Sequence, residues 1–270
     1  GFNAMLIIKF LQLSALLFVY QRSRKFLAAQ LLSVKFWQLP LIAGPILVFM
    51  SLLSLRDVLL AYFALGFVTE SQLNRKIVFG IATLLLRTHL AAALIVGYLL
   101  VSIFFSHKSK IGAARICGIA LLSYIAGTVS YWIGAVIQKG VNFDAPRTVF
   151  TQFKFSQLAA NFFGLQFLAL SNPDDRIVAS STFTLLLSRL VFFDTLLIPV
   201  LFLIAIYRHP EFLTKQKVLT FHAFMFFYGV VSQTSFNSTR QNIPFLACMG
   251  LLAVADIEHF RKIKAKVAPK

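Results

Sequence analysis

The stretch Leu84–Ala93, which reads LLLRTHLAAA, places a guanidinium and an imidazole two residues apart between two apolar runs. In a continuous helix, at ~100° per residue, Arg87 and His89 would point about 200° apart. If that helix crossed a membrane, one of the two side chains would face lipid, which costs a few kcal/mol or more. A helix break near Thr88 avoids this cost. We therefore expect the chain to turn here, at the surface of a bilayer.

The composition is that of a polytopic membrane protein. Of the 270 residues, 59% are hydrophobic and only 13% are charged, whereas a soluble domain carries about 25% charged residues. The net charge of +17 would suggest a nucleic-acid partner for a soluble protein. In this chain Lys and Arg gather in short segments between apolar runs, which is typical of topology signals. We expect membrane lipid as a partner and no nucleic acid.

The apolar runs predict an all-α fold: a polytopic transmembrane helical bundle of about nine passes, with some short or broken helices. We expect a single integral membrane domain, 1–270, and the proximity of Gly1 to the first apolar run predicts that an N-terminal portion is missing. Residues 138–181 form an expected outer-face loop that contains a surface helix. The expected spans are 2–20, 38–55, 57–70, 77–86, 90–106, 116–137, 181–206, 218–236 and 243–257.

The basic residues indicate which side of the membrane each loop occupies. Most of the 26 fall in one alternating set of loops, which the positive-inside rule assigns to the cytoplasm together with the C-terminus. The alternation works only if the chain turns at Arg87–His89, so it supports the break independently. We therefore expect an integral membrane protein whose C-terminus lies in the cytoplasm. The cytoplasmic set is Arg22, Arg24, Lys25, Lys35, Arg75, Lys76, Lys108, Lys110, Arg115, Arg208, Lys215, Lys217, Arg261, Lys262, Lys264, Lys266 and Lys270.

Several arginines remain on the opposite, outer side of the membrane, where the positive-inside rule predicts few basic residues. A helix N-terminus near Leu90 and nearby guanidinium groups form an anion site, for which phosphate is the usual occupant. The residues that we assign to this anion site are Arg56, Arg87, Arg147, Arg176 and Arg240. A plainer interpretation stays open, in which Arg87 reaches the lipid headgroups and His89 packs at the interface.

Several kinds of chemistry are disfavoured by the motifs. The chain has no HExxH, no P-loop, no GxSxG and no Cys/His cluster. Cys117 and Cys248 fall in separate apolar runs, without C-x-x-C spacing. We expect no cofactor, although a divalent metal held by Asp144, Asp174 and Asp175 stays open as an alternative.

Three short motifs resemble bacterial polysaccharide polymerases of the O-antigen (Wzy-like) kind, which belong to the glycosyltransferase-C class of membrane proteins. The first is a Pro-containing segment followed by Ser and a basic–acidic pair that opens an apolar helix. The second is an Arg-Pro-His element between two apolar runs, in which this chain has Thr in place of Pro. The third is a late outer Arg followed by Pro. The matching residues are Pro40, Ser54, Arg56 and Asp57, then Arg87, Thr88 and His89, then Arg240 and Pro244.

This resemblance covers roughly residues 38–260 and implies a glycosyltransferase that polymerises polyprenyl-diphosphate-linked glycans at the periplasmic face of the inner membrane. Undecaprenyl diphosphate would carry the glycan, and its diphosphate would be the anion that these arginines bind. The resemblance makes His89, Asp57 and Asp144 the candidates for a catalytic base. Other polysaccharide-assembly membrane proteins would be partners. Two alternatives remain. A transporter or flippase for an anionic lipid or solute would use the same arginines, and a structural subunit of a membrane complex would use the charges only as anchors.

Overall fold

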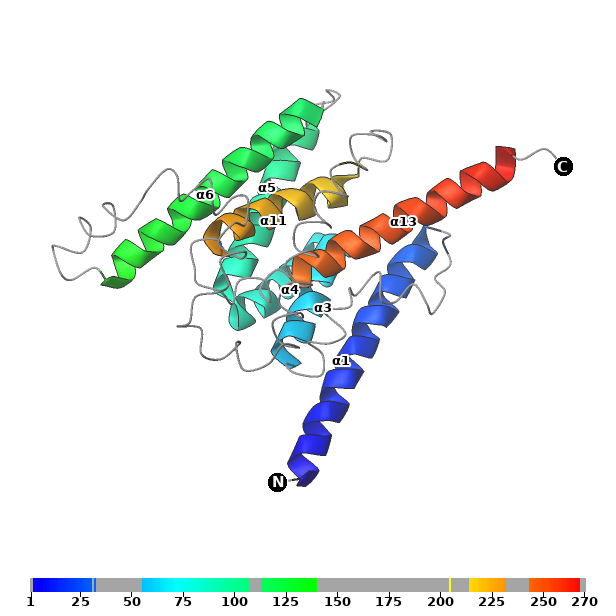
Figure 1. Cartoon of the computed structure of the whole chain (residues 1–270), viewed down its shortest axis with the longest axis horizontal. Coiled ribbons are helices and arrows are strands. Elements are labelled where there is room, and N and C mark those ends of the chain that lie inside the picture. Colours follow the sequence, from blue (N-terminus) through cyan, green and yellow to red (C-terminus); the bar gives the residue numbers. More distant parts are fainter. Residues whose placement is uncertain are drawn as a thin grey trace, which may run out of the picture.

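The computed structural model describes residues 2–30, 32, 55–106, 113–139, 204, 214–231 and 243–267. Within these residues the protein is all-helical and contains no strand, which confirms the predicted all-α class. The arrangement is drawn in Figure 1. The helices are α1 (Phe2–Ala29), α3 (Leu55–Thr69), α4 (Leu73–Leu86), α5 (Thr88–Ser106), α6 (Ala113–Lys139), α11 (Lys215–Val231) and α13 (Ile243–Val267).

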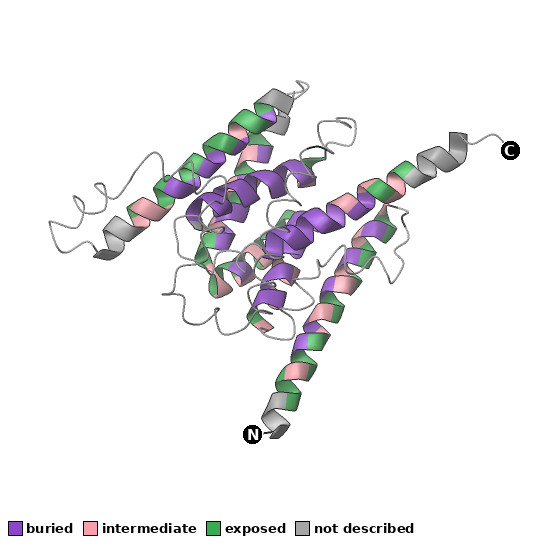
Figure 2. Cartoon of the chain, in the orientation of Figure 1, coloured by how far each residue is buried: buried purple, intermediate pink, exposed green. Residues whose placement is uncertain are grey.

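The core forms around α11, which is buried through nearly its whole length (Figure 2). This helix packs against α5, α6 and α13. A helix with apolar residues on every face is stable only when other helices surround it. Aromatic side chains supply much of the contact: the Phe224 ring stacks on Tyr228 at 5.7 Å between centroids, and Phe227 lies 5.3 Å from Phe245 of α13.

The helices α3 and α4 form an antiparallel hairpin, which defines the two ends of the bundle. Residues 70–72 connect them, and Phe79 of α4 packs on Tyr62 and Phe63 of α3 at 6.1 and 6.4 Å between centroids. We call the end with residues 70–72 the hairpin end. The opposite end, where α3 begins and α4 gives way to α5, is the break end.

Six of the predicted spans correspond to α3, α4, α5, α6, α11 and α13, and the span 2–20 corresponds to the first two thirds of α1. The loop assignment of the basic residues is corrected: those that the structure describes lie on helices. They are Arg22, Arg24 and Lys25 on α1, Arg75 and Lys76 on α4, Arg115 on α6, Lys215 and Lys217 on α11, and Arg261, Lys262, Lys264 and Lys266 on α13. On α1, Arg22 bonds to Gly66 of α3, while Arg24 and Lys25 are exposed. The predicted span 38–55, nearly all of 181–206 and most of the loop 138–181 lie outside the described residues.

Two of the described helices are long and apolar enough to cross a membrane. They contain the segments Arg115–Gly134 of α6 and Ile243–Phe260 of α13. The apolar segment Thr88–Ile103 of α5 is shorter. The 14 residues of α4 extend only about 21 Å, at ~1.5 Å per residue, against a hydrocarbon core of about 30 Å.

Candidate functional site

Arg87 is the residue at which α4 ends and α5 begins. Its backbone is extended, with φ −161° and ψ 102°. Its N–H still donates to the Thr83 carbonyl at 2.7 Å, and its carbonyl accepts the Ala91 N–H at 3.2 Å, so it closes one helix and opens the next. The N–H groups of residues 88–90 precede the first bond of α5 and point out of the helix end. The break predicted near Thr88 is therefore present, and it falls at Arg87.

The Arg87 side chain is half-buried against α11. Its Cζ lies 5.9 Å from the centroid of the Phe227 ring, which is within cation–π range. Phe227 is fully buried and packs in turn on Phe245 of α13. The guanidinium thus lies where α4, α5, α11 and α13 approach one another. In this partly dehydrated position it attracts an anion more strongly than it would in bulk water.

The other described residues of the predicted site lie at the same end but differ in exposure. His89 and Arg56 are exposed, whereas Asp57 is only 1% exposed. Successive residues of a helix point about 100° apart, so Arg56 and Asp57 face different surroundings. Asp57 lies in the first turn of α3, where the helix dipole stabilises a carboxylate. Arg56, Arg87 and His89 are the accessible residues of this group, and Asp57 packs inside.

The remaining predicted site residues are not part of this geometry. Asp144, Arg147, Arg176 and Arg240 lie outside the described residues, and so do Asp174 and Asp175. Across the described ranges, no group of three or more His, Cys, Asp or Glu side chains could hold a metal ion. Cys117 is exposed and Cys248 is buried, and both are free thiols.

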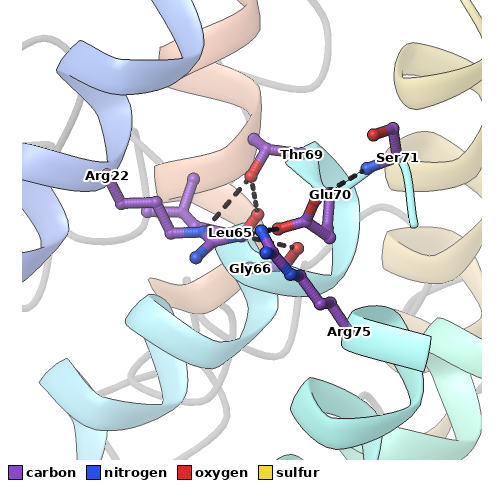
Figure 3. A network of polar contacts seen from close by, with 7 residues as sticks. All are labelled: Arg22, Leu65, Gly66, Thr69, Glu70, Ser71 and Arg75. Carbon is purple, nitrogen blue, oxygen red and sulfur yellow. Dashed lines mark hydrogen bonds and ion pairs between the residues drawn. The ribbon is translucent and has the colours of Figure 1, made fainter. Parts of the chain in front are cut away.

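A polar cluster at the hairpin end, absent from the predicted site, joins α1 to α3 and α4 (Figure 3). Arg22 Nη2 donates to the Glu70 carboxylate and to the Gly66 carbonyl, each at 3.3 Å. Its Nε donates to the Thr69 hydroxyl at 3.3 Å. Arg75 Nη1 lies 4.0 Å from the same Glu70 carboxylate. The sequence feature that could have predicted this cluster is Glu70, an acidic residue close to basic ones at the end of an apolar run.

A second ion pair at the hairpin end joins α11 to α13. Lys217 Nζ donates to the Asp256 carboxylate at 2.6 Å, and the side chain of Lys217 is only 4% exposed. One turn further along α13, His259 Nε2 lies 3.4 Å from Gln30 Oε1 at the end of α1. The sequence feature that could have predicted this pair is Asp256, an acidic residue inside the apolar run 243–257. These contacts join α1, α11 and α13 at the end opposite Arg87.

His222 is a buried polar residue for which the sequence suggested no role. It lies in the middle of α11 with 0% exposure, and neither ring nitrogen has a hydrogen-bond partner among the described residues. A buried polar group without a partner costs about 1–3 kcal/mol.

We expect His222→Leu to raise the free energy of unfolding by about 1 kcal/mol, because the substitution removes the unsatisfied nitrogens and keeps an apolar side chain in place. Denaturant titration of the purified protein in one detergent measures the change. Thr220→Val is the matched control on the same helix, since the Thr220 hydroxyl is bonded to the Gln216 carbonyl at 2.7 Å; it should bring no gain. A loss of stability in His222→Leu would contradict the prediction.

The described residues thus define an all-helical protein with a half-buried arginine at a helix break and a charged cluster at the opposite end. Comparison with family models, curated proteins and solved structures gave no match to this chain. Its function is therefore argued from its own residues.

Proposed function

We propose that this chain is an integral membrane protein of about nine passes that acts as a glycosyltransferase on polyprenyl-diphosphate-linked glycans, of the O-antigen polymerase kind. The observation that carries the proposal is the position of Arg87, which lies half-buried at a helix break beside the N-terminus of α5. A guanidinium and free N–H groups at one point form a site for a phosphate oxygen.

The outer surface of the described helices supports placement in a membrane. Large apolar side chains are exposed on α1, α4, α5, α6 and α13, which is costly in water and favourable in lipid. They include Phe10 on α1 (71% exposed), Leu85 on α4 (81%) and Leu122 on α6 (65%).

The distribution of charge along the bundle supports the proposed orientation. Arg22, Arg75 and Lys217, from three segments that the positive-inside rule assigns to one side, all lie at the hairpin end. Arg56 and Arg87, assigned to the other side, lie at the break end. In the orientation that we propose, the site at Arg87 faces the periplasm and the hairpin end faces the cytoplasm.

The reaction assigns a distinct task to each residue. The acceptor hydroxyl oxygen forms a bond to the anomeric carbon, the bond from that carbon to the diphosphate oxygen breaks, and the diphosphate leaves with the electron pair. Fixed cations stabilise that leaving group, and Arg87 and Arg56 are the described candidates. The hydroxyl proton passes to a base, for which His89 is accessible at the same helix break. The inward position of Asp57 makes it the weaker candidate for the base.

We expect Arg87→Ala to shorten the glycan chains made in the native membrane, with the polymerisation rate reduced about 10²-fold or more, the usual effect of removing one preorganised donor at a developing charge. The polymerisation rate of Arg87→Lys should fall between those of the unsubstituted chain and Arg87→Ala, because an ammonium keeps the charge but loses the bidentate contact. Gel separation of the glycans measures chain length.

Arg24→Ala is the matched control, since Arg24 is exposed on α1 and far along the bundle from Arg87. It should leave the chain-length distribution unchanged. Long chains made by Arg87→Ala at a normal protein level would remove Arg87 from the mechanism and contradict the proposal.

A further inference from the structure

A cavity of about 470 Å³ opens at the hairpin end, opposite the proposed site at Arg87. It lies between the start of α4, the end of α5 and the start of α11. Its polar lining comes from Glu70, Ser71, Lys76, Ser102, Lys215 and Gln216. Charged side chains from segments that are distant in sequence therefore line the same cavity.

The charges in this cavity leave it electropositive. Glu70 is already engaged by Arg22 and lies near Arg75. In contrast, neither Lys76 nor Lys215 forms an ion pair with a carboxylate within the described ranges. Lys76 is half-buried, with Nζ 5.4 Å from the centroid of Tyr98. The two ammonium groups and the Ser71 hydroxyl are therefore available to an anion, whereas the Ser102 hydroxyl donates to the Leu99 carbonyl at 2.8 Å.

An apolar groove of about 230 Å³ continues from the cavity along the surface between α4 and α5. The two share Leu73, Lys76 and Tyr98. From Leu73 to Leu84 the groove follows α4 over twelve residues, a rise of about 16 Å at ~1.5 Å per residue. That is about half of a 30 Å hydrocarbon core, the depth of one leaflet. Apart from Lys76 and Tyr98, its lining is aliphatic, aromatic or glycine.

We propose that the cavity and groove form a binding site for a phospholipid with an anionic headgroup, with the phosphate between Lys76 and Lys215 and one acyl chain along α4 and α5. The shape favours a lipid, because the charged cavity continues at Lys76 into an apolar groove about as long as one leaflet is deep. The site rests on the membrane placement proposed above, with the lipid drawn from the leaflet at the hairpin end. It is separate from the proposed reaction at Arg87.

The test uses the purified full chain in detergent and native mass spectrometry with phosphatidylglycerol, phosphatidylcholine or inorganic phosphate. The unsubstituted chain should bind phosphatidylglycerol more tightly than phosphatidylcholine. The double variant Lys76→Gln/Lys215→Gln should lower this preference about 30-fold, which corresponds to ~1 kcal/mol for each lysine. Ile81→Trp, which fills the groove at a residue 52% exposed, should weaken binding of both lipids. The control Arg24→Gln/Lys25→Gln removes two exposed charges of α1 and should keep the preference.

Three results would overturn the site: an unchanged preference in the double lysine variant, an equal loss in the α1 control, or displacement of the lipid by inorganic phosphate together with no effect of Ile81→Trp. The last would identify a site for a soluble anion. Thermal unfolding of each variant excludes misfolding as the cause of lost binding.

The lipid site and the glycosyltransferase function are tested independently of each other. Arg87→Ala should bind phosphatidylglycerol like the unsubstituted chain, so a negative result in the glycan assay leaves the lipid assay intact. Extraction of the chain from membranes by alkaline carbonate would instead contradict the membrane placement on which both depend.

Discussion

Asp256→Ala should lower the free energy of unfolding by about 3–5 kcal/mol, the usual cost of breaking a buried ion pair by removing one partner. Lys217 donates to the Asp256 carboxylate at 2.6 Å and its side chain is only 4% exposed. The substitution therefore leaves an ammonium inside the contact between α11 and α13 without its carboxylate. Unfolding of the purified protein by increasing amounts of a denaturing detergent measures the loss.

Two controls separate the buried charge from a general loss of contact. The double variant Lys217→Met/Asp256→Leu should recover most of the stability, because well-packed apolar residues can replace a buried pair at little cost. Arg75→Ala should change stability by less than about 1 kcal/mol, since Arg75 is 65% exposed and lies 4.0 Å from Glu70. If Asp256→Ala proved no more harmful than Arg75→Ala, the buried pair would not be a stabilising contact.

Gly127→Ala should destabilise the protein by about 3 kcal/mol, the upper part of the range for overpacking. At this position α6 crosses α11 so closely that a Cβ would meet the Phe226 carbonyl oxygen and lie 2.9 Å from its carbon. Gly229 of α11 makes the reciprocal approach to Tyr124. The obstructing atoms are backbone, so the helices must separate to admit one methyl group. Close approach through small residues is a common way for helices to pack in membranes.

Gly118→Ala and Gly134→Ala are matched controls on the same helix, because a Cβ at either position meets no atom within 4 Å. Each should be neutral or raise stability by about 0.5–1 kcal/mol through helix propensity. Thermal unfolding of all three variants in one detergent decides the comparison. Equal stability of Gly127→Ala and the two controls would show that α6 and α11 are not in close backbone contact at Gly127.

Local sequence was enough to predict the helical segments and the break between α4 and α5. Each apolar run satisfies its own backbone hydrogen bonds, and Arg87 with His89 cannot share one face of a continuous helix. The boundaries were less accurate where a tertiary contact extends a helix: α1 continues through Arg22 because the guanidinium bonds to Glu70 and Gly66. Only part of the predicted site can be compared with the structure, since Asp144 and Arg240 lie outside the described residues.

The amino-acid sequence by itself determined the helices, their order and the segregation of basic residues, because hydrogen bonds within a helix and the burial of apolar runs depend on neighbours along the chain. Only the tertiary structure decided which charges meet. Arg22 bonds to Glu70 across 48 positions and Lys217 to Asp256 across 39, and Asp57 packs inward while Arg56 beside it is exposed. Those outcomes follow from the rotation and depth at which helices pack, which no local pattern of residues specifies.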